Sequence, residues 1–342
     1  MTTQVMSTQD GNDIKRRYVF ICGLHRSGTS LLGRNVARLE NCTGFKDTGA
    51  TEDEGQFLQD IYPISKVYGG AGRFGFDPRA HLTEISSLLT PENALKLRQS
   101  WERYWDRSKA ICVEKTPGNL LKTRFLQAMF PESYFIVIRR HPVSVSMANQ
   151  KWKGDLAAIH NLFEHWLHCH ALLDEDKKHL KHVYELSYED YVQDPGKYHA
   201  EIAIFIGSRV PKDLMEPVTG VYNQKYFNRW SELLNTSPLK GYYRFVAAKY
   251  ETMFTKYGYS LVKGFGVNEE QFLGADRIGE TVGALYCLLA DANALIIRLT
   301  TRSKGYVRRQ LRAHLPESLK VRIKDAVPKP THVKSPPTIA SS

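Results

Sequence analysis

The chain has 342 residues, 42% of them hydrophobic and 24% charged, and its formal net charge is +11. This composition is ordinary for a soluble globular protein with one large domain, or with one domain and an appendage. No N-terminal apolar run resembles a signal peptide, and no stretch reaches the roughly 18 uncharged residues of a membrane span, so we expect neither feature.

Most of the positive charge lies near the end of the chain. Between Arg298 and Lys334 there are eleven Lys or Arg and two acids, which carry +9 of the net +11. The remainder is nearly neutral, so the basic character of the chain does not indicate a nucleic-acid partner, and none is expected. Five widely spaced cysteines without a Cys-x-x-Cys pair favour a reducing, cytoplasmic environment. Cys22 and Cys112 lie in apolar runs and are expected to be buried thiols.

Strand-like and helical segments alternate along the first two thirds of the chain. The expected strands are Tyr18–Cys22, Ala110–Val113, Tyr134–Ile138 and Val183–Leu186. The expected helices are Ser30–Leu39, Asn119–Phe130, Asp155–Leu180 and one that begins at Asp194-Pro195. The first three strands are apolar at nearly every position, as in parallel strands covered on both faces. The pattern predicts a doubly wound or three-layer α/β fold with ligands at the carboxyl ends of the strands.

The character of the chain changes after Tyr259. Seven apolar residues follow 4-3-4-3-4-3 spacing and predict one helical stripe: Ile278, Val282, Leu285, Leu289, Ala292, Ile296 and Leu299. The stripe either packs on the domain's own surface, or mediates a homodimer, or makes a peripheral contact with an anionic membrane, for which the inner face is an option. The expected organisation is a disordered 1–15, a domain at 16–265, a helical basic extension at 270–325 and a disordered tail at 328–342.

The first strand leads into a phosphate-binding loop. Gly23 and Gly28 enclose four residues, Thr29 and Ser30 follow, and a helix begins there. In a nucleotide triphosphatase, Lys would stand where this chain has Thr29. The loop's own cation is Arg26. Backbone amides at the helix start can still hold a phosphate group, so the loop predicts a different nucleotide.

Three more motifs follow at the ends of expected strands. They are Val113-Glu-Lys-Thr-Pro-Gly-Asn119, Tyr134-Phe-Ile-Val-Ile-Arg-Arg-His-Pro142 and Leu186-Ser-Tyr-Glu-Asp-Tyr-Val-Gln-Asp-Pro195. Together with the loop, they resemble the sulfotransferases that use 3′-phosphoadenosine 5′-phosphosulfate (PAPS), in the bacterial branch related to carbohydrate and tyrosylprotein enzymes. The resemblance covers about residues 17–260 and implies a P-loop nucleotide-kinase-like three-layer fold with a central parallel sheet and a helical C-terminal extension.

The resemblance implies that two anion sites hold the donor. The loop residues that would hold the 5′ phosphosulfate are His25, Arg26, Ser27, Gly28, Thr29 and Ser30. Arg26 would also stabilise charge on the bridging oxygen as the S–O bond breaks. Arg140 would grip the 3′ phosphate, and Arg229 matches a basic residue that contacts the donor in some members. The family's reaction needs no metal.

One position departs from the family. A serine eight residues after the arginine also binds the 3′ phosphate in the family, but counting from Arg140 leads to Ala148. Either Ser146 substitutes, or the phosphate is held by one hydrogen bond fewer.

The acceptor loses a proton as it attacks, so a base is required. Family members place a glutamate after the first helix, which makes Glu54 the first candidate and Glu52 the second. These acids could instead belong to a solvated loop and helix cap. His25 is a more distant candidate. Lys115 resembles a lysine that lies near the acceptor and the sulfate, unless it only pairs with Glu114 or another neighbour.

The predicted reaction moves a sulfuryl group from PAPS to a hydroxyl, or less readily an amine, and releases adenosine 3′,5′-bisphosphate. The acceptor would be a carbohydrate, a glycolipid or a small molecule. Two other classes remain open, namely a P-loop kinase or triphosphatase and an inactive nucleotide-binding module. A metal site at His165 and Cys169, four residues apart on an expected helix, is disfavoured because no carboxylate or second cluster completes it.

Overall fold

The computed structural model describes residues 16–152, 158–212, 216–218, 223–267 and 281–296. The predicted disorder of 1–15 and 328–342, and most of the predicted basic extension, lie outside these residues. The chain divides into two compact units, Met1–Ala294 and Leu295–Ser342. The predicted domain boundary near 265–270 stays a prediction.

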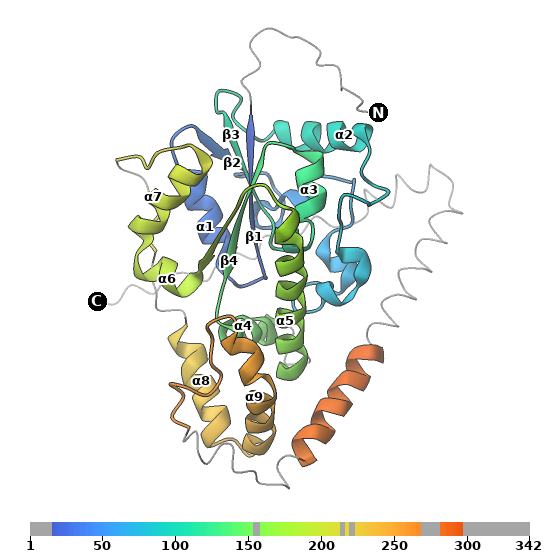
Figure 1. The fold of residues 1–342 in the computed structure, drawn as a ribbon, viewed down its shortest axis with the longest axis vertical. Coiled ribbons are helices and arrows are strands. Elements are labelled where there is room, and N and C mark those ends of the chain that lie inside the picture. The colour runs from blue at the N-terminus through green and yellow to red at the C-terminus, as the bar shows by residue number, and fades with distance from the viewer. Residues whose placement is uncertain (1–15, 153–157, 213–215, 219–222, 268–280, 297–342) are drawn as a thin grey trace. The chain divides into compact units, whose positions relative to one another are not determined.

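The first unit is built on a sheet of five parallel strands (Figure 1). The strands are β1 (Arg17–Gly23), β2 (Cys42–Gly44), β3 (Ile111–Lys115), β4 (Ser133–Arg139) and β5 (Val183–Ser187), in the spatial order β2-β3-β1-β4-β5. All four predicted strands are therefore confirmed. The three-residue β2 was not predicted, because so short a segment has no readable periodicity.

Helices cover both faces of the sheet. They are α1 (Thr29–Val36), α2 (Pro91–Glu102), α3 (Thr123–Met129), α4 (Pro142–Trp152), α5 (Ile159–Asp176), α6 (Tyr188–Gln193), α7 (Pro195–Ile206), α8 (Gln224–Asn235) and α9 (Lys240–Thr255). In Figure 1, α1, α6 and α7 lie on one side of the sheet, and α2, α3 and α5 lie on the other. The predicted three-layer α/β architecture with a central parallel sheet is confirmed.

The central strand supplies both cores. Val19 and Ile21 pack with α1 and α7, whereas Phe20 and Cys22 pack on the side of α2, α3 and α5. All four side chains are fully buried. Successive residues of a strand point to opposite faces, so a strand buried on both faces is apolar at every position.

Three predicted helices have different bounds, and the first, predicted over Ser30–Leu39, is the shorter α1 (Thr29–Val36). The segment predicted as one helix, Asn119–Phe130, is a 3-10 turn, η6 (Pro117–Leu121), followed by α3. Lys122 separates them with non-helical backbone angles, and its ammonium donates to the Gly118 carbonyl. The long helix predicted over Asp155–Leu180 is α5, which is shorter. The predicted capping at Asp194 is confirmed, since its carboxylate accepts from the Lys197 amide at 3.0 Å.

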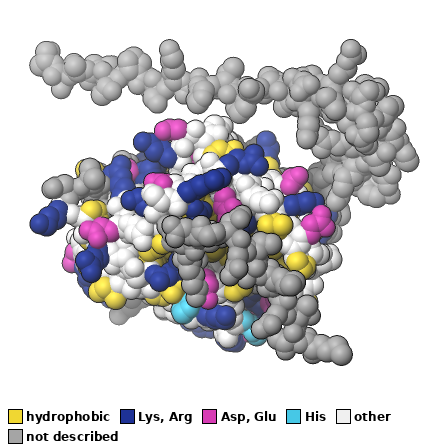
Figure 2. Space-filling view, turned by 90° about the horizontal axis from the view of Figure 1, so that it is seen from above, with side chains coloured by type: hydrophobic (Ala, Val, Ile, Leu, Met, Phe, Trp, Pro, Cys, Tyr) yellow, Lys and Arg dark blue, Asp and Glu magenta, His cyan; other side chains and the backbone are white. Residues whose placement is uncertain are grey.

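Residues 281–296 form a further helix, so a helix is present within the predicted extension. Among the residues that the structure describes, no helix is long and apolar enough to cross a bilayer. On the face drawn in Figure 2, Lys and Arg side chains are dispersed among Asp and Glu and do not form one basic patch. All five cysteines are free and buried, as predicted for Cys22 and Cys112.

Trp101 connects α2 to the loop that follows β2. Its side chain is fully buried between Phe20 and Phe130, and its indole N–H donates to the Gly55 carbonyl at 3.1 Å. We expect Trp101→Ala to lower the free energy of unfolding by about 3–5 kcal/mol, because a cavity and an unpaired carbonyl remain. Urea denaturation measures the change. Leu95→Ala, on the exposed face of the same helix, should stay within about 0.5 kcal/mol; similar losses in both variants would contradict this assignment.

Candidate functional site

The loop between β1 and α1 turns tightly over the carboxyl edge of the sheet. A Cβ atom at Gly23 would lie 2.6 Å from the Ile138 carbonyl oxygen, so β1 and β4 approach closely only because this residue is glycine. Gly28 has a φ of 98°, and a Cβ there would meet the Tyr188 ring at 2.6 Å. Since α1 begins at Thr29, the amides of its first turn have no acceptor within the helix and face the loop. The amide of Ser27 instead closes the turn by donating to the Leu24 carbonyl at 3.0 Å.

Arg140, directly after β4, is held in a fixed position beside this loop. Its Nη1 donates to the Arg26 carbonyl at 2.8 Å, and its Nε donates to the Asn223 side chain at 2.7 Å. The guanidinium lies 4.1 Å from the centre of the Tyr188 ring. The remaining Nη2 is buried and has no hydrogen-bond partner among the described residues. A buried, unpartnered guanidinium nitrogen is a ready donor for a ligand anion.

A cavity of about 640 Å³ collects most of the predicted donor residues. Its lining includes His25, Arg26, Gly28, Thr29, Ser30, Glu54 and Arg140. These residues come from the loop after β1, the start of α1, the segment after β2 and the end of β4. Carboxyl ends of parallel strands therefore bring them together, as the strand pattern predicts. The volume lies within the usual range for small-molecule sites.

Glu54 lies in the wall of the cavity and forms an ion pair with Lys115. Glu54 is 7% exposed, and its carboxylate lies 3.5 Å from the Lys115 ammonium. Burial raises the pKa of Glu54 above its ordinary value, an effect that Lys115 opposes. Lys115 also donates to the Glu52 carbonyl at 2.9 Å. A buried carboxylate that keeps a raised pKa beside a cation is suited to accept a proton.

The candidate bases differ in their surroundings. Glu54 is buried at the cavity wall, which argues against its being part of a solvated loop. Glu52 also lines the cavity, but its side chain is exposed and accepts from the Ser30 hydroxyl at 3.3 Å. His25 lines the cavity too and packs against Phe74. Lys115 pairs with Glu54 and not with its sequence neighbour Glu114.

Glu114 is a second buried carboxylate, and it holds the backbone next to Glu54 in place. It is fully buried and accepts from the Gly55 amide at 2.9 Å, from the Thr116 hydroxyl at 2.5 Å and from the Asn119 side chain. The bond to Gly55 fixes the residue that directly follows Glu54. A Cβ at Gly55 would collide with the Glu114 carboxylate, so this turn also requires glycine. Glu114 is thus a positioning residue for Glu54 that sequence reasoning missed.

Three predicted donor residues are not part of the cavity lining, and the first of them, Ser27, is fully buried. Ser146 is buried in α4, and its hydroxyl has no partner among the described residues, but Ala148 and Asn149 are the α4 residues that line the cavity. Arg229 lies on α8, is 62% exposed at its side chain and pairs with Glu232 at 3.0 Å. This geometry gives no support to a donor contact for Ser146 or Arg229.

Other residues at the site were not singled out from the sequence. Tyr188, Tyr226 and Asn149 line the cavity, and Asn223 orients Arg140. Tyr188 lies within the fourth motif, so its place after β5 was the available signal. Tyr226 belongs to the same α8 segment as Arg229, the residue singled out there, whereas Asn223 directly precedes α8 and lies in none of the motifs.

A second cavity of about 600 Å³ adjoins the first. Ser30, Arg34 and Glu52 line both cavities, and Lys115 lines the second. The Glu54–Lys115 pair therefore joins a residue of the first cavity to a residue of the second. This arrangement would allow two ligands to meet at that pair.

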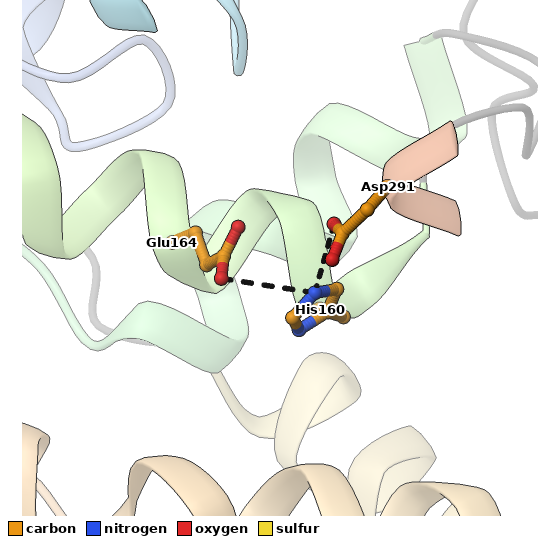
Figure 3. A group of neighbouring side chains, drawn as sticks. All are labelled: His160, Glu164 and Asp291. Carbon is orange, nitrogen blue, oxygen red and sulfur yellow. Dashed lines mark hydrogen bonds and ion pairs between the residues drawn. The ribbon is translucent and has the colours of Figure 1, made fainter. Parts of the chain in front are cut away.

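The potential metal ligands are explained by hydrogen bonding. His160, Glu164 and Asp291 place their ligand atoms within 4.8 Å of one another (Figure 3). Burial lowers the pKa of His160, Tyr250 bonds to its Nδ1 at 2.6 Å, and its Nε2 lies 3.0 Å from Asp291. A neutral ring with its proton on Nε2 satisfies all of these contacts. At the predicted alternative, His165 Nε2 already accepts from the Gly75 amide at 3.1 Å.

The buried Glu114 carboxyl gives a pH prediction. Burial raises its pKa from 4.5 to about 7, although the Thr116 and Gly55 hydrogen bonds oppose the shift. The folded state therefore holds this proton more tightly than the unfolded state, and stability is lost as pH rises from 4.5 to about 7. We expect Glu114→Gln, which cannot ionise, to gain stability relative to the native chain across this window.

Urea denaturation at about pH 5 and about pH 8 tests the expectation. Asn119 can accommodate the new amide, because its Oδ1 has no partner among the described residues. Glu92→Gln makes the same chemical change at an exposed position of α2 and serves as the control. Stability curves of Glu114→Gln and the native chain that run parallel would contradict the prediction.

Comparisons with known proteins agree with the motifs. No curated protein matches the chain. Among solved structures, the sulfotransferase domain of the Synechococcus PCC 7002 olefin synthase is 19% identical over 64% of this chain and 84% of that one, with a TM-score of 0.41. A sulfotransferase from Alicyclobacillus acidocaldarius is 15% identical over 70% of this chain and 96% of that one, with a TM-score of 0.39. The model of the sulfotransferase family matches residues 18–212, which is more than half of the chain. The chain therefore belongs to the sulfotransferase family.

Proposed function

We propose that this protein transfers a sulfuryl group from PAPS to a hydroxyl group of a carbohydrate, glycolipid or small-molecule acceptor. The observation that carries the proposal is the cavity in which the P-loop, the unpartnered Arg140 Nη2 and the Glu54 carboxylate meet. It offers two separate places for anions and one base. PAPS has a 5′ phosphosulfate and a 3′ phosphate, so it requires such a pair of anion sites.

The residues that would bind PAPS divide between its two anionic groups. The amides at the start of α1 and the exposed Arg26 side chain would hold the 5′ phosphosulfate. Arg140 would bind the 3′ phosphate through Nη2, since its other nitrogens are engaged by Arg26 and Asn223. The Tyr226 ring lines the cavity near Arg140 and offers a stacking surface for the adenine. Ala148 supplies no hydroxyl, so Asn149 is the polar side chain that α4 brings to this region.

The transfer step requires a base on the acceptor side. The acceptor oxygen forms the new S–O bond while its proton passes to Glu54, and the bond from sulfur to the bridging oxygen breaks. Adenosine 3′,5′-bisphosphate leaves, and Arg26 and Lys115 stabilise the charge that develops. Loose in-line transfer of this kind depends chiefly on positioning and electrostatics, by analogy with phosphoryl transfer. None of these roles requires a metal.

The second cavity would take the acceptor. A nucleotide would fill most of the first cavity, and the second cavity reaches the Glu54–Lys115 pair from the other side. Its lining includes Arg34, Arg38 and Lys46 beside Glu52 and Asp53, which suits a polar acceptor with several hydroxyl groups.

A P-loop kinase or triphosphatase is the main alternative. Such an enzyme uses a loop lysine and a strand-end Asp that holds Mg²⁺. Thr29 replaces the lysine here, and β1, β3 and β4 end at Gly23, Lys115 and Arg139. A binding module without activity is the second alternative, which an enzymatic assay would separate from the proposal.

Nucleotide binding is the first test. We expect calorimetric titration to show binding of adenosine 3′,5′-bisphosphate without magnesium, and no comparable binding of ATP with magnesium. Arg140→Ala should weaken bisphosphate binding by about 10–100-fold, because a charged hydrogen bond contributes about 1.5–3 kcal/mol. Arg229→Ala, which removes only a surface pair, should bind as the native chain does. Binding of ATP alone would overturn the family's donor for this chain.

The base gives a pH prediction. Because burial raises the pKa of Glu54 and a base must be ionised to act, the transfer rate should rise with pH through an apparent pKa above 4.5. Glu54→Gln should lower kcat by about 10²–10⁴-fold while bisphosphate affinity is unchanged. Donor hydrolysis, in which water replaces the acceptor, measures both effects before an acceptor is known. Glu52→Gln is the matched control, and a loss confined to that variant would assign the base to Glu52.

A further inference from the structure

The helix formed by residues 281–296 has a small, polar inner face. A Cβ at Gly283 would lie 2.6 Å from Phe245 Cβ on α9, and Cys287 is buried. One turn further, Asp291 accepts from Asn161 at 2.8 Å and lies 3.0 Å from His160 Nε2 on α5. Figure 3 shows Asp291 pointing from this helix toward His160. Gly283, Cys287 and Asp291 are spaced by four residues, so they lie on one face of the helix, and this inner face contacts the domain.

The opposite face carries the predicted apolar stripe. Val282, Leu285 and Leu289 are 42%, 55% and 59% exposed, and Leu288 beside them is 66% exposed. The helix therefore packs on the domain's own surface, which was one of the three expectations, but among the described residues its apolar stripe does not make that contact. Asp291 is the only charged residue between 281 and 296, and it is held on the inner face. The outer face therefore carries no charged side chain that would have to lose its hydration when the face binds a partner.

The chain that follows determines which partner suits this face. Residues 298–334 carry a net charge of +9, supplied by eleven Lys or Arg and two acids. A second copy of the chain would bring another segment of the same positive charge, which opposes association. An anionic bilayer attracts each basic residue and accepts the apolar side chains at its interface. Stable peripheral binding generally needs both contributions, and this chain places them next to each other in sequence.

We propose that the outer face of helix 281–296, which is defined by Val282, Leu285, Leu288 and Leu289, docks on an anionic lipid bilayer. The helix would lie in the interface and would not cross the membrane, because its inner face remains bound to the domain. This proposal does not depend on the reaction that the enzyme catalyses.

Flotation of the full chain with lipid vesicles tests the proposal. We expect binding to vesicles that contain about 30% phosphatidylglycerol, and little binding to pure phosphatidylcholine. The double variant Leu285→Asp/Leu289→Asp should reduce the bound fraction at least about tenfold, because the apolar contribution is lost and negative charge meets the anionic surface. Raising the salt concentration should weaken binding of the native chain, because exposed charges are screened.

A matched variant controls for the added charge. Ile85 and Ile204 are exposed on other parts of the domain, so Ile85→Asp/Ile204→Asp makes the same chemical change elsewhere and should float as the native chain does. Thermal melting of both variants checks that they fold. Native-like flotation of Leu285→Asp/Leu289→Asp, or no binding of the native chain to anionic vesicles, would overturn the proposal. A dimer seen by sedimentation that this variant abolishes, without flotation, would assign the face to a second copy.

Discussion

The hydrogen bond from Arg140 Nη1 to the Arg26 carbonyl is the contact on which the cavity depends. It joins the segment after β4 to the loop after β1, and these two strands are neighbours in the sheet. Arg26 has a φ of 75°, an unusual conformation for a residue with a side chain. Arg140 stabilises that turn while its Nη2 stays available to a ligand. One guanidinium can therefore shape the loop and provide the second anion site.

The acidic side of the cavity is organised by burial. Glu54 has a neighbouring cation, Lys115, whereas Glu114 below it is held by hydrogen bonds from Gly55, Thr116 and Asn119. Burial raises the pKa of both carboxyls. The two groups nevertheless differ in access, because Glu54 lines the cavity and Glu114 does not. The arrangement separates a group that can exchange a proton with a ligand from one that holds the turn in place.

Several residues show the limits of what local patterns can predict. Trp230, an aromatic residue next to Arg229 in the sequence, is fully buried and donates to the Leu261 carbonyl at 2.8 Å, so it offers no surface to a nucleotide. Counting from Arg140 leads to Ala148, which does line the cavity, whereas Ser146, the serine that could have replaced it, does not. The apolar stripe after residue 278 was visible in the sequence, but its spacing does not reveal which face of the helix meets the domain. In each case the deciding fact is the direction of a side chain.

The sequence by itself determined the four longer strands, their parallel arrangement and the loop whose glycines and Arg26 indicate an anion site. Those features follow from local rules, since apolar runs predict buried strands and a short glycine frame predicts a tight turn. Only the tertiary structure decided that Glu114 positions Glu54, that Asn223 orients Arg140 and that Arg229 lies apart from the cavity. Such contacts join residues that are up to 83 positions apart in the chain, so no local pattern encodes them. They arise when packing brings the carboxyl ends of separate strands to one edge of the sheet.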